Sequence, residues 1–131
     1  MESIVAKYLA SKKHQPHQWA VNDCNTFIVE WIDLCYGTDW EGMLQFDYED
    51  VRGAIRYHKN LPFNAEEFMH MAGYDNITTT PKSGDVLLQD RGAFFCAWLV
   101  CLDYAYTVDH NLGFVATTVN TLEDYSTWRR A

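Results

Sequence analysis

The cysteine of Asn22-Asp23-Cys24 is the residue of this chain best suited to nucleophilic chemistry. The apolar residues from Cys24 to Cys35 recur at helical spacing, so we expect Cys24 to open an amphipathic helix. A helix N-terminus carries a partial positive charge and unpaired N–H groups, which favour a thiolate over a thiol. We expect Asp23 to cap this helix. Two interpretations of Cys24 stay open: a nucleophile, or a small buried hydrophobic residue.

A cysteine nucleophile needs a base, and the side chain that usually supplies it is histidine. His110, within Asp-His-Asn-Leu-Gly, is the first candidate base and His17 is the second. A residue of a polar turn is the alternative interpretation of His110. Gln18, six residues before Cys24, is a candidate donor to an oxyanion, with a surface amide as the alternative.

The sequence predicts neither a cofactor nor a metal site. The four cysteines (Cys24, Cys35, Cys96 and Cys101) contain no CxxC pair and are spread over most of the chain. His14 and His17 are separated by Pro16, which breaks a helix, and no third ligand has suitable spacing. We therefore expect free thiols and exposed loop histidines.

The composition favours one globular domain over residues 1–131, because 48% of the residues are hydrophobic and 21% are charged. A net charge of −8 disfavours binding to nucleic acid or to anionic membranes. We find no apolar run of membrane-spanning length and no signal-peptide pattern, so we expect synthesis in the cytoplasm without membrane insertion.

The order of the expected elements indicates an α+β fold, with N-terminal helices packed on a C-terminal antiparallel sheet. Helical spacing appears in the first dozen residues, from Cys24 to a cap at Gly37, in residues 47–59, and after a cap at Asn64. Residues 76–81 are expected to form a loop. Strands are expected within residues 86–119, where β-branched and aromatic residues are frequent.

Aromatic residues make up 15% of the chain, more than one small core is expected to hold. We expect some of them to form a docking surface for a partner. The residues considered for this surface are Trp40, Phe46, Tyr48, Tyr57, Phe63, Tyr125 and Trp128.

Two segments resemble the papain-like NlpC-type cell-wall peptidase superfamily. Trp19-Ala20-Val21-Asn22-Asp23-Cys24 resembles the aromatic residue, short loop and Asp-Cys that open the family's catalytic helix. Pro81-Lys82-Ser83-Gly84-Asp85-Val86-Leu87-Leu88 resembles the segment that leads into its first core strand. With a terminal Trp128-Arg129, the chain is most similar to small NlpC-like proteins encoded in bacteriophage tail gene clusters.

The resemblance implies that Cys24 occupies the nucleophile's position and that a histidine should begin the second core strand. Aligning Ala97-Trp98 with the Gly-Ile of the family's His-Val-Gly-Ile places Phe95 where that histidine is expected. Shifting the alignment by one or two residues gives Phe94 or Cys96, and never histidine. Loss of this base would remove the hydrolytic chemistry.

The leading functional hypothesis is therefore a virion component of a bacteriophage tail that uses a degenerate NlpC-type fold. Its expected partners are other tail proteins in a multi-subunit assembly, and peptidoglycan of the host wall. The alternative is an active cysteine peptidase or amidase that cuts the peptide crosslinks of peptidoglycan. A bacterial immunity or regulatory protein is a third hypothesis, because a fold does not determine a function.

Overall fold

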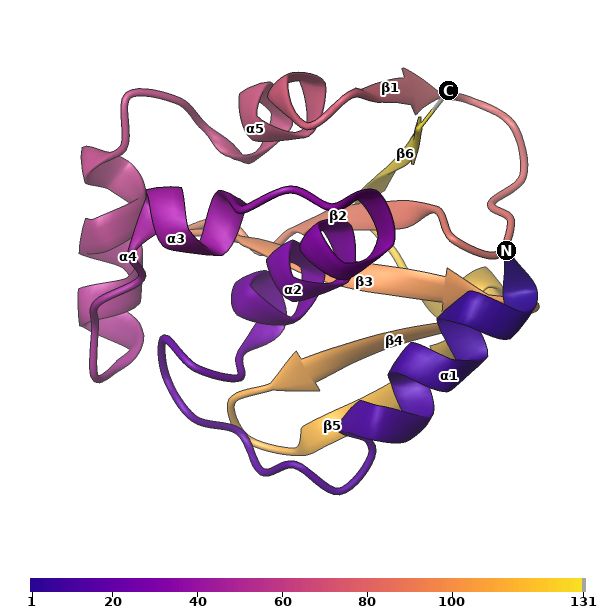
Figure 1. Ribbon diagram of the computed structural model, residues 1–131, viewed down its shortest axis with the longest axis horizontal. Helices are drawn as coiled ribbons and strands as arrows, with labels where there is room; N and C mark the ends of the chain where they lie inside the picture. Colours follow the sequence, from indigo (N-terminus) through magenta and orange to yellow (C-terminus); the bar gives the residue numbers. More distant parts are fainter. Residues whose placement is uncertain (131) are drawn as a thin grey trace.

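The computed structural model describes residues 1–130, which form five α-helices and a six-stranded antiparallel sheet (Figure 1). The helices are α1 (Glu2–Lys12), α2 (Cys24–Tyr36), α3 (Trp40–Leu44), α4 (Val51–Asn60) and α5 (Ala65–Met71). The strands are β1 (Tyr74–Ile77), β2 (Val86–Asp90), β3 (Phe95–Cys101), β4 (Tyr104–Asp109), β5 (Gly113–Thr118) and β6 (Tyr125–Arg130). A 3-10 turn, η1 (Val119–Thr121), connects β5 to β6. The predicted α+β class is thus confirmed.

The strands follow the order β1-β6-β2-β3-β4-β5, so the C-terminal strand lies inside the sheet between β1 and β2. Helix α2 crosses the middle of the sheet in front of β3, and α1 packs beside it (Figure 1). Between these helices and the sheet lies the main core, whose largest fully buried side chains include Trp31, Trp128, Tyr74 and Phe27. The opposite face of the sheet buries a smaller cluster of Leu87, Cys96, Trp98, Val100 and Ala105.

Both ends of α2 are capped by side chains or backbone of the types expected from the sequence. Asp23 and Thr26 form a capping box, in which each side chain accepts the other residue's backbone N–H. Gly37 ends the helix with a φ of 68°, a left-handed conformation that glycine adopts without steric cost. Phe27, Ile28 and Trp31 are buried along the helix. These caps fix where α2 begins, and therefore where Cys24 lies.

The Gly84-Asp85 and Trp128-Arg129 segments contact each other in space. The Asp85 carboxylate, 2% exposed, accepts hydrogen bonds from Arg129 Nε at 2.8 Å and from Arg129 Nη2 at 2.7 Å. Its Oδ2 also accepts the backbone N–H of Lys82 at 2.8 Å. A bidentate arginine–carboxylate pair is a strong, directional contact. It holds β6 against the beginning of β2.

Three elements were not expected from the sequence. Helix α3 is only five residues long, and β1 occupies part of the segment expected to be a loop. Strand β6 extends the sheet beyond residues 86–119 and pairs with both β1 and β2. In the part of the chain that the structure describes, no helix is long and apolar enough to cross a membrane.

We predict that Asp85→Ala lowers the free energy of unfolding by about 3 kcal/mol, because it leaves Arg129 without its buried partner. Urea denaturation followed by circular dichroism measures the change. Glu123→Ala is the matched control, since this carboxylate is exposed and its side chain makes no hydrogen bond within residues 1–130. Equal stability of Asp85→Ala and Glu123→Ala would contradict a structural role for the pair.

Candidate functional site

Cys24 is the first residue of α2, and although the residue is partly exposed, its thiol is buried. Its side chain lines a small cavity of about 30 Å³ beneath the start of the helix. The polar residues around this cavity come from five separate segments of the chain. They are His17, Asp23, Asn25, Tyr48, His58, Arg91, Cys96, Asp109 and His110. The sheet and α2 thus gather most of the chain's candidate chemical groups at one point.

A second thiol, Cys96, lies beside Cys24: Cys24 packs against the buried cluster that contains Cys96, and both residues line the small cavity. Cys24 Sγ also lies close to the backbone N–H of Ala97. This N–H is free because the pairing of β3 with β4 extends only as far as Leu99 and Tyr106. Beyond that pair, Thr107 Oγ1 donates to Ala97 O at 2.7 Å and lies 3.8 Å from Cys96 Sγ. Cys24 therefore lies where β3 and β4 separate.

The contact between the two thiols changes both of their pKa values. The hydrogen bond with Cys24 lowers the pKa of Cys96, and the positive charge of Arg91 lowers it further, against the effect of burial. The same contact, followed by burial, raises the pKa of Cys24 well above its ordinary value. The pair therefore loses its first proton readily and holds its second proton firmly.

Asp23 holds the segments around Cys24 in place through four hydrogen bonds. Its Oδ1 accepts the backbone N–H groups of Asn25 and Thr26, at 3.1 and 2.9 Å. Its Oδ2 accepts the Ala20 N–H at 2.9 Å and the Tyr48 hydroxyl at 2.6 Å. Burial, together with the negative charge of Asp23, raises the pKa of Tyr48, which keeps its proton and donates it. Asp23 is thus a structural cap that is fully hydrogen-bonded.

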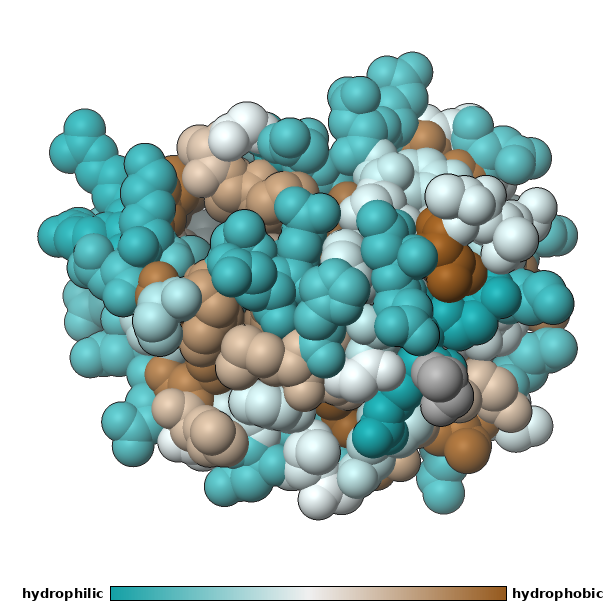
Figure 2. Space-filling model, turned by 90° about the horizontal axis from the view of Figure 1, so that it is seen from above, coloured by the Kyte–Doolittle hydropathy of each residue, from teal (hydrophilic) through white to brown (hydrophobic). Residues whose placement is uncertain are grey.

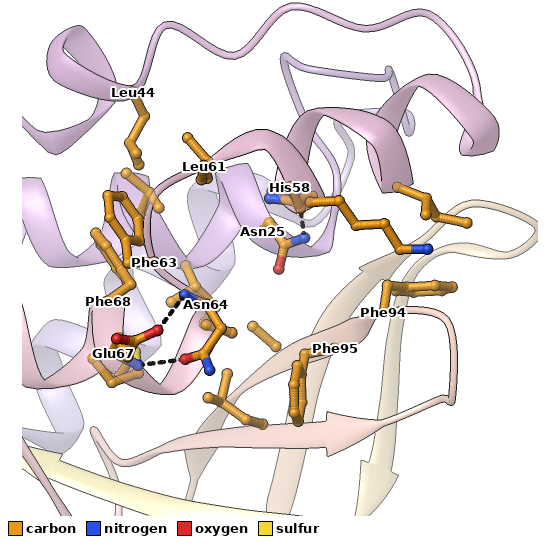
Figure 3. A pocket seen from close by; sticks show the side chains of 18 of the residues that line it. Asn25, Leu44, His58, Leu61, Phe63, Asn64, Glu67, Phe68, Phe94 and Phe95 are labelled. Atoms are coloured by element: carbon orange, nitrogen blue, oxygen red, sulfur yellow. Dashed lines mark hydrogen bonds between the residues drawn. The ribbon is translucent and has the colours of Figure 1, made fainter.

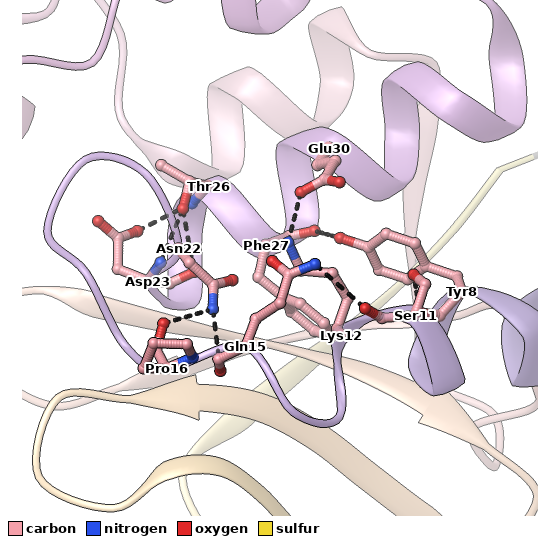
Figure 4. A network of polar contacts seen from close by, with 10 residues as sticks. All are labelled: Tyr8, Ser11, Lys12, Gln15, Pro16, Asn22, Asp23, Thr26, Phe27 and Glu30. Atoms are coloured by element: carbon pink, nitrogen blue, oxygen red, sulfur yellow. Dashed lines mark hydrogen bonds and ion pairs between the residues drawn. The ribbon is translucent and has the colours of Figure 1, made fainter.

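The loop before Asp23 is fixed by a second polar network (Figure 4). Asn22, 3% exposed, donates its amide to Pro16 O at 2.9 Å. Gln18 and Asn22 also pair through their backbones. Nearby, the buried Lys12 binds Glu30 at 2.7 Å and links α1 to α2. These contacts hold the turn that leads the chain into Cys24.

The two candidate bases lie at the cavity but do not bind Cys24. No imidazole nitrogen of residues 1–130 is hydrogen-bonded to Cys24 Sγ. His17 is half-buried, and burial lowers its pKa. His110 is exposed and stacks on Trp19, with ring centroids 5.7 Å apart. Asp109 accepts the N–H groups of the two residues after His110, as expected for a polar turn.

The structure separates Gln18 and Phe95 from Cys24. Gln18 is exposed and does not line the small cavity. Phe95 packs against the main core, whereas the adjacent Cys96 belongs to the cluster on the opposite face. Of the residues considered for the place of the missing histidine, Cys96 is thus the one that contacts Cys24.

A larger cavity of about 460 Å³ adjoins the small one (Figure 3). Asn25, Ile55, His58 and Phe94 line both cavities. Asn25 Nδ2 lies 3.1 Å from His58 Nε2, and burial lowers the pKa of His58. A neutral His58 can accept the proton of the Asn25 amide, so this pair forms a polar edge between the two cavities. Most of the other lining residues are apolar, which is typical of small-molecule pockets.

The aromatic residues considered for a docking surface lie partly or wholly inside the molecule. Tyr48 and Trp128 are buried, and the other five candidate aromatics are partly buried. Phe46, Tyr48 and Tyr57 pack on one another, with ring centroids between 5.4 and 6.3 Å apart. On the face shown in Figure 2, hydrophilic side chains predominate and hydrophobic residues form small separate patches. Part of the aromatic excess is thus used in packing within the molecule.

Sequence reasoning missed the roles of Cys96, Tyr48 and Arg91. Cys96 lies in an uninterrupted apolar run, in which nothing marks the face that each residue occupies. Tyr48 is 25 residues from its partner Asp23, and Arg91 is 18 residues from its ion-pair partner Asp109. Such pairings depend on the tertiary fold and leave no local signal. Within residues 1–130, no three His, Cys, Asp or Glu side chains are gathered to hold a metal ion.

The fold and the site define an α+β domain with a helix-capped cysteine in contact with a second thiol. The chain belongs to the DUF6950 family, described as a domain of unknown function, whose family model matches residues 1–129. No curated protein and no solved structure matches the chain.

We predict that Asp23→Ala lowers the free energy of unfolding by about 3 kcal/mol, because it removes a helix cap and leaves the buried Tyr48 hydroxyl without an acceptor. Urea denaturation measures this loss. Asp39→Ala is the matched control: Asp39 caps the exposed helix α3 through the Gly42 N–H, and its loss is expected to cost about 1 kcal/mol. Equal losses would contradict the special role of Asp23.

We predict that the folded state loses stability as the pH falls below the ordinary histidine pKa of 6.5. Burial lowers the pKa values of His58 and His17 in the folded state, so the unfolded chain binds their protons more tightly. Unfolding free energies measured between pH 5 and pH 7 test this slope. His58→Gln is expected to reduce it, whereas the exposed His14→Gln is expected to leave it unchanged.

Proposed function

We propose that this chain is a bacteriophage tail component that keeps an NlpC-type scaffold without its hydrolytic activity. One observation carries the proposed loss of activity: Cys24 packs against the buried cluster that contains Cys96, and no imidazole nitrogen of residues 1–130 is hydrogen-bonded to its thiol. A cysteine hydrolase needs a base to ionise its thiol and an acid to protonate the leaving amine. A neighbouring thiol supplies neither group well at neutral pH.

The surroundings of Cys24 support the same conclusion. Two N–H groups at the start of α2, those of Asn25 and Thr26, are already bound to Asp23 and cannot stabilise an oxyanion. Asp23 itself has no spare acceptor, since its two oxygens receive four donors. The hydrogen bonds of Asp23 at the start of α2 therefore serve to hold the helix to the preceding loop and to Tyr48.

The tail role rests on the resemblance of three segments to small NlpC-like proteins of tail gene clusters. Two of these segments meet in the contact of Asp85 with Arg129, which gives them a shared structural purpose. We propose that the chain works in a multi-subunit assembly with other tail proteins, with the host wall as a further binding target.

An active cysteine peptidase or amidase is the second candidate, because His17 and His110 line the same cavity as Cys24. In this alternative, one imidazole moves to within about 3 to 4 Å of Cys24 Sγ when a peptidoglycan peptide binds. The adjoining cavity of about 460 Å³ would then receive part of the substrate.

We predict that Cys24→Ala leaves phage infectivity unchanged, because the thiol has no catalytic duty in the proposed role. The variant is introduced into the gene of a phage that carries this chain, and titre and virion composition are measured. Cys35→Ala is the matched control, as Cys35 lies on the same helix and is partly exposed. Purified wild-type protein is also incubated with peptidoglycan fragments, and no peptide release is expected.

The two candidates give opposite results. Peptide release by the wild type that is lost in Cys24→Ala and retained in Cys35→Ala would establish the peptidase and overturn the proposal. Absence of the chain from purified virions would overturn the tail role independently of any result on hydrolysis.

A further inference from the structure

We propose that the cavity of about 460 Å³ is a binding site for a small, neutral aromatic molecule with one hydrogen-bond donor, such as a phenol. The cavity lies between α2, α4, the start of α5 and the hairpin of β2 and β3 (Figure 3). Its volume is within the range of small-molecule sites, about 300 to 1,000 Å³. Binding of such a molecule does not depend on the proposed tail role.

Aromatic side chains form much of the wall of this cavity. The phenylalanine residues that line it are Phe46, Phe63, Phe68, Phe94 and Phe95. Phe63 and Phe68 are stacked, with ring centroids 6.3 Å apart, and Phe94 and Phe95 line the cavity from the sheet side (Figure 3). Rings favour offset-stacked or edge-to-face contact with a further ring, so this wall favours an aromatic ligand over a linear chain.

The side-chain oxygen of Asn25 supplies a hydrogen-bond acceptor to this apolar wall. The amide nitrogen of Asn25 lies 3.1 Å from His58 Nε2, and the oxygen is directed away from His58 into the cavity (Figure 3). This oxygen makes no hydrogen bond within residues 1–130. An acceptor beside apolar side chains is stabilised by a donor, so a ligand hydroxyl or N–H would bind the Asn25 oxygen.

The charged groups of the lining favour a neutral ligand. Lys59 and Glu67 are the charged residues of the lining; they have opposite signs, and both are exposed. Glu67 is also occupied in the capping box of α5, where its carboxylate accepts the Asn64 N–H at 3.0 Å. Burial lowers the pKa of His58, so this imidazole is neutral at pH 7. The lining thus has no net charge to offset the cost of burying a charged ligand.

Helix α4 gives an independent reason to expect a ligand. None of its residues is buried, although Ile55 and His58 line the cavity. A helix in a protein is held in place mainly by an apolar face packed against other groups. A ligand in the cavity would cover Ile55 and so complete the packing of α4 on the rest of the molecule.

The test titrates the purified protein with N-phenyl-1-naphthylamine, a neutral aromatic amine with a single N–H whose fluorescence rises in an apolar site. We expect a saturable rise that corresponds to a single site per chain. This reporter is then displaced with 2-naphthol, with its methyl ether 2-methoxynaphthalene, and with 1-heptanol, a linear alcohol of similar hydrophobicity to 2-naphthol. We expect 2-naphthol to bind more tightly than 1-heptanol, because only the naphthol has rings to pack on the phenylalanine wall.

Variants locate the binding in this cavity. Ala65→Phe places a ring in the cavity from the start of α5, and it is expected to weaken reporter binding about tenfold. Ala10→Phe is the matched control, because Ala10 is an exposed alanine of α1 that does not line the cavity. Asn25→Leu is expected to weaken 2-naphthol about fivefold and not 2-methoxynaphthalene, since only the naphthol donates a hydrogen bond. Circular dichroism checks that each variant is folded.

Several outcomes would overturn the proposal. They are the lack of a saturable fluorescence rise, tighter binding of 1-heptanol than of 2-naphthol, equal reporter binding by Ala65→Phe and Ala10→Phe, and an equal effect of Asn25→Leu on both naphthalene probes. Displacement of the reporter by peptidoglycan peptides at lower concentrations than 2-naphthol would assign the cavity to a peptidase substrate instead. Phage titre and virion composition test the tail role separately, so failure of one proposal is distinguishable from failure of the other.

Discussion

The geometry of the site depends on one buried carboxylate, that of Asp23, which is 3% exposed. A buried charge is costly unless it is hydrogen-bonded, and Asp23 receives donors from the preceding turn, from the start of α2 and from Tyr48. These segments cannot separate without leaving the carboxylate unsatisfied. The direction in which Cys24 leaves the helix follows from this constraint.

The second half of the site lies in the sheet, at the point where strands β3 and β4 separate. Because β3 and β4 pair only as far as Leu99 and Tyr106, the Ala97 N–H is left free to bind Cys24. The residue next to Ala97 then decides the chemistry, since an imidazole there would act as a base and the Cys96 thiol cannot. The fold determines where Cys24 lies, and the side chain that faces it from β3 determines which chemistry it could do.

The sequence predicted the elements with a strong local signal. The cap at Asp23, the apolar face of α2 and the left-handed Gly37 follow from spacing and residue type, and the structure has all three. The short elements α3, β1 and β6 carry too few periodic residues to be recognised. The position of Cys96 beside Cys24 could not be predicted either. Polar and apolar residues do not alternate along β3, because this strand is buried on both faces. A count of aromatic residues could not predict which of them pack on one another, as Phe46, Tyr48 and Tyr57 do.

The parts of the chain that preserve the fold are physically separate from the part that would preserve hydrolysis. Asp85 and Arg129 hold β6 against the start of β2, and Asp23 holds the start of α2, yet none of these contacts involves position 96. Replacing an imidazole at position 96 with another side chain would therefore leave the fold-defining contacts intact. The Asn22-Asp23-Cys24 and Gly84-Asp85 segments are therefore explained by the contacts that hold the fold, and they are no evidence of hydrolysis. In this fold, evidence for or against hydrolysis lies in the side chain that faces Cys24 from β3.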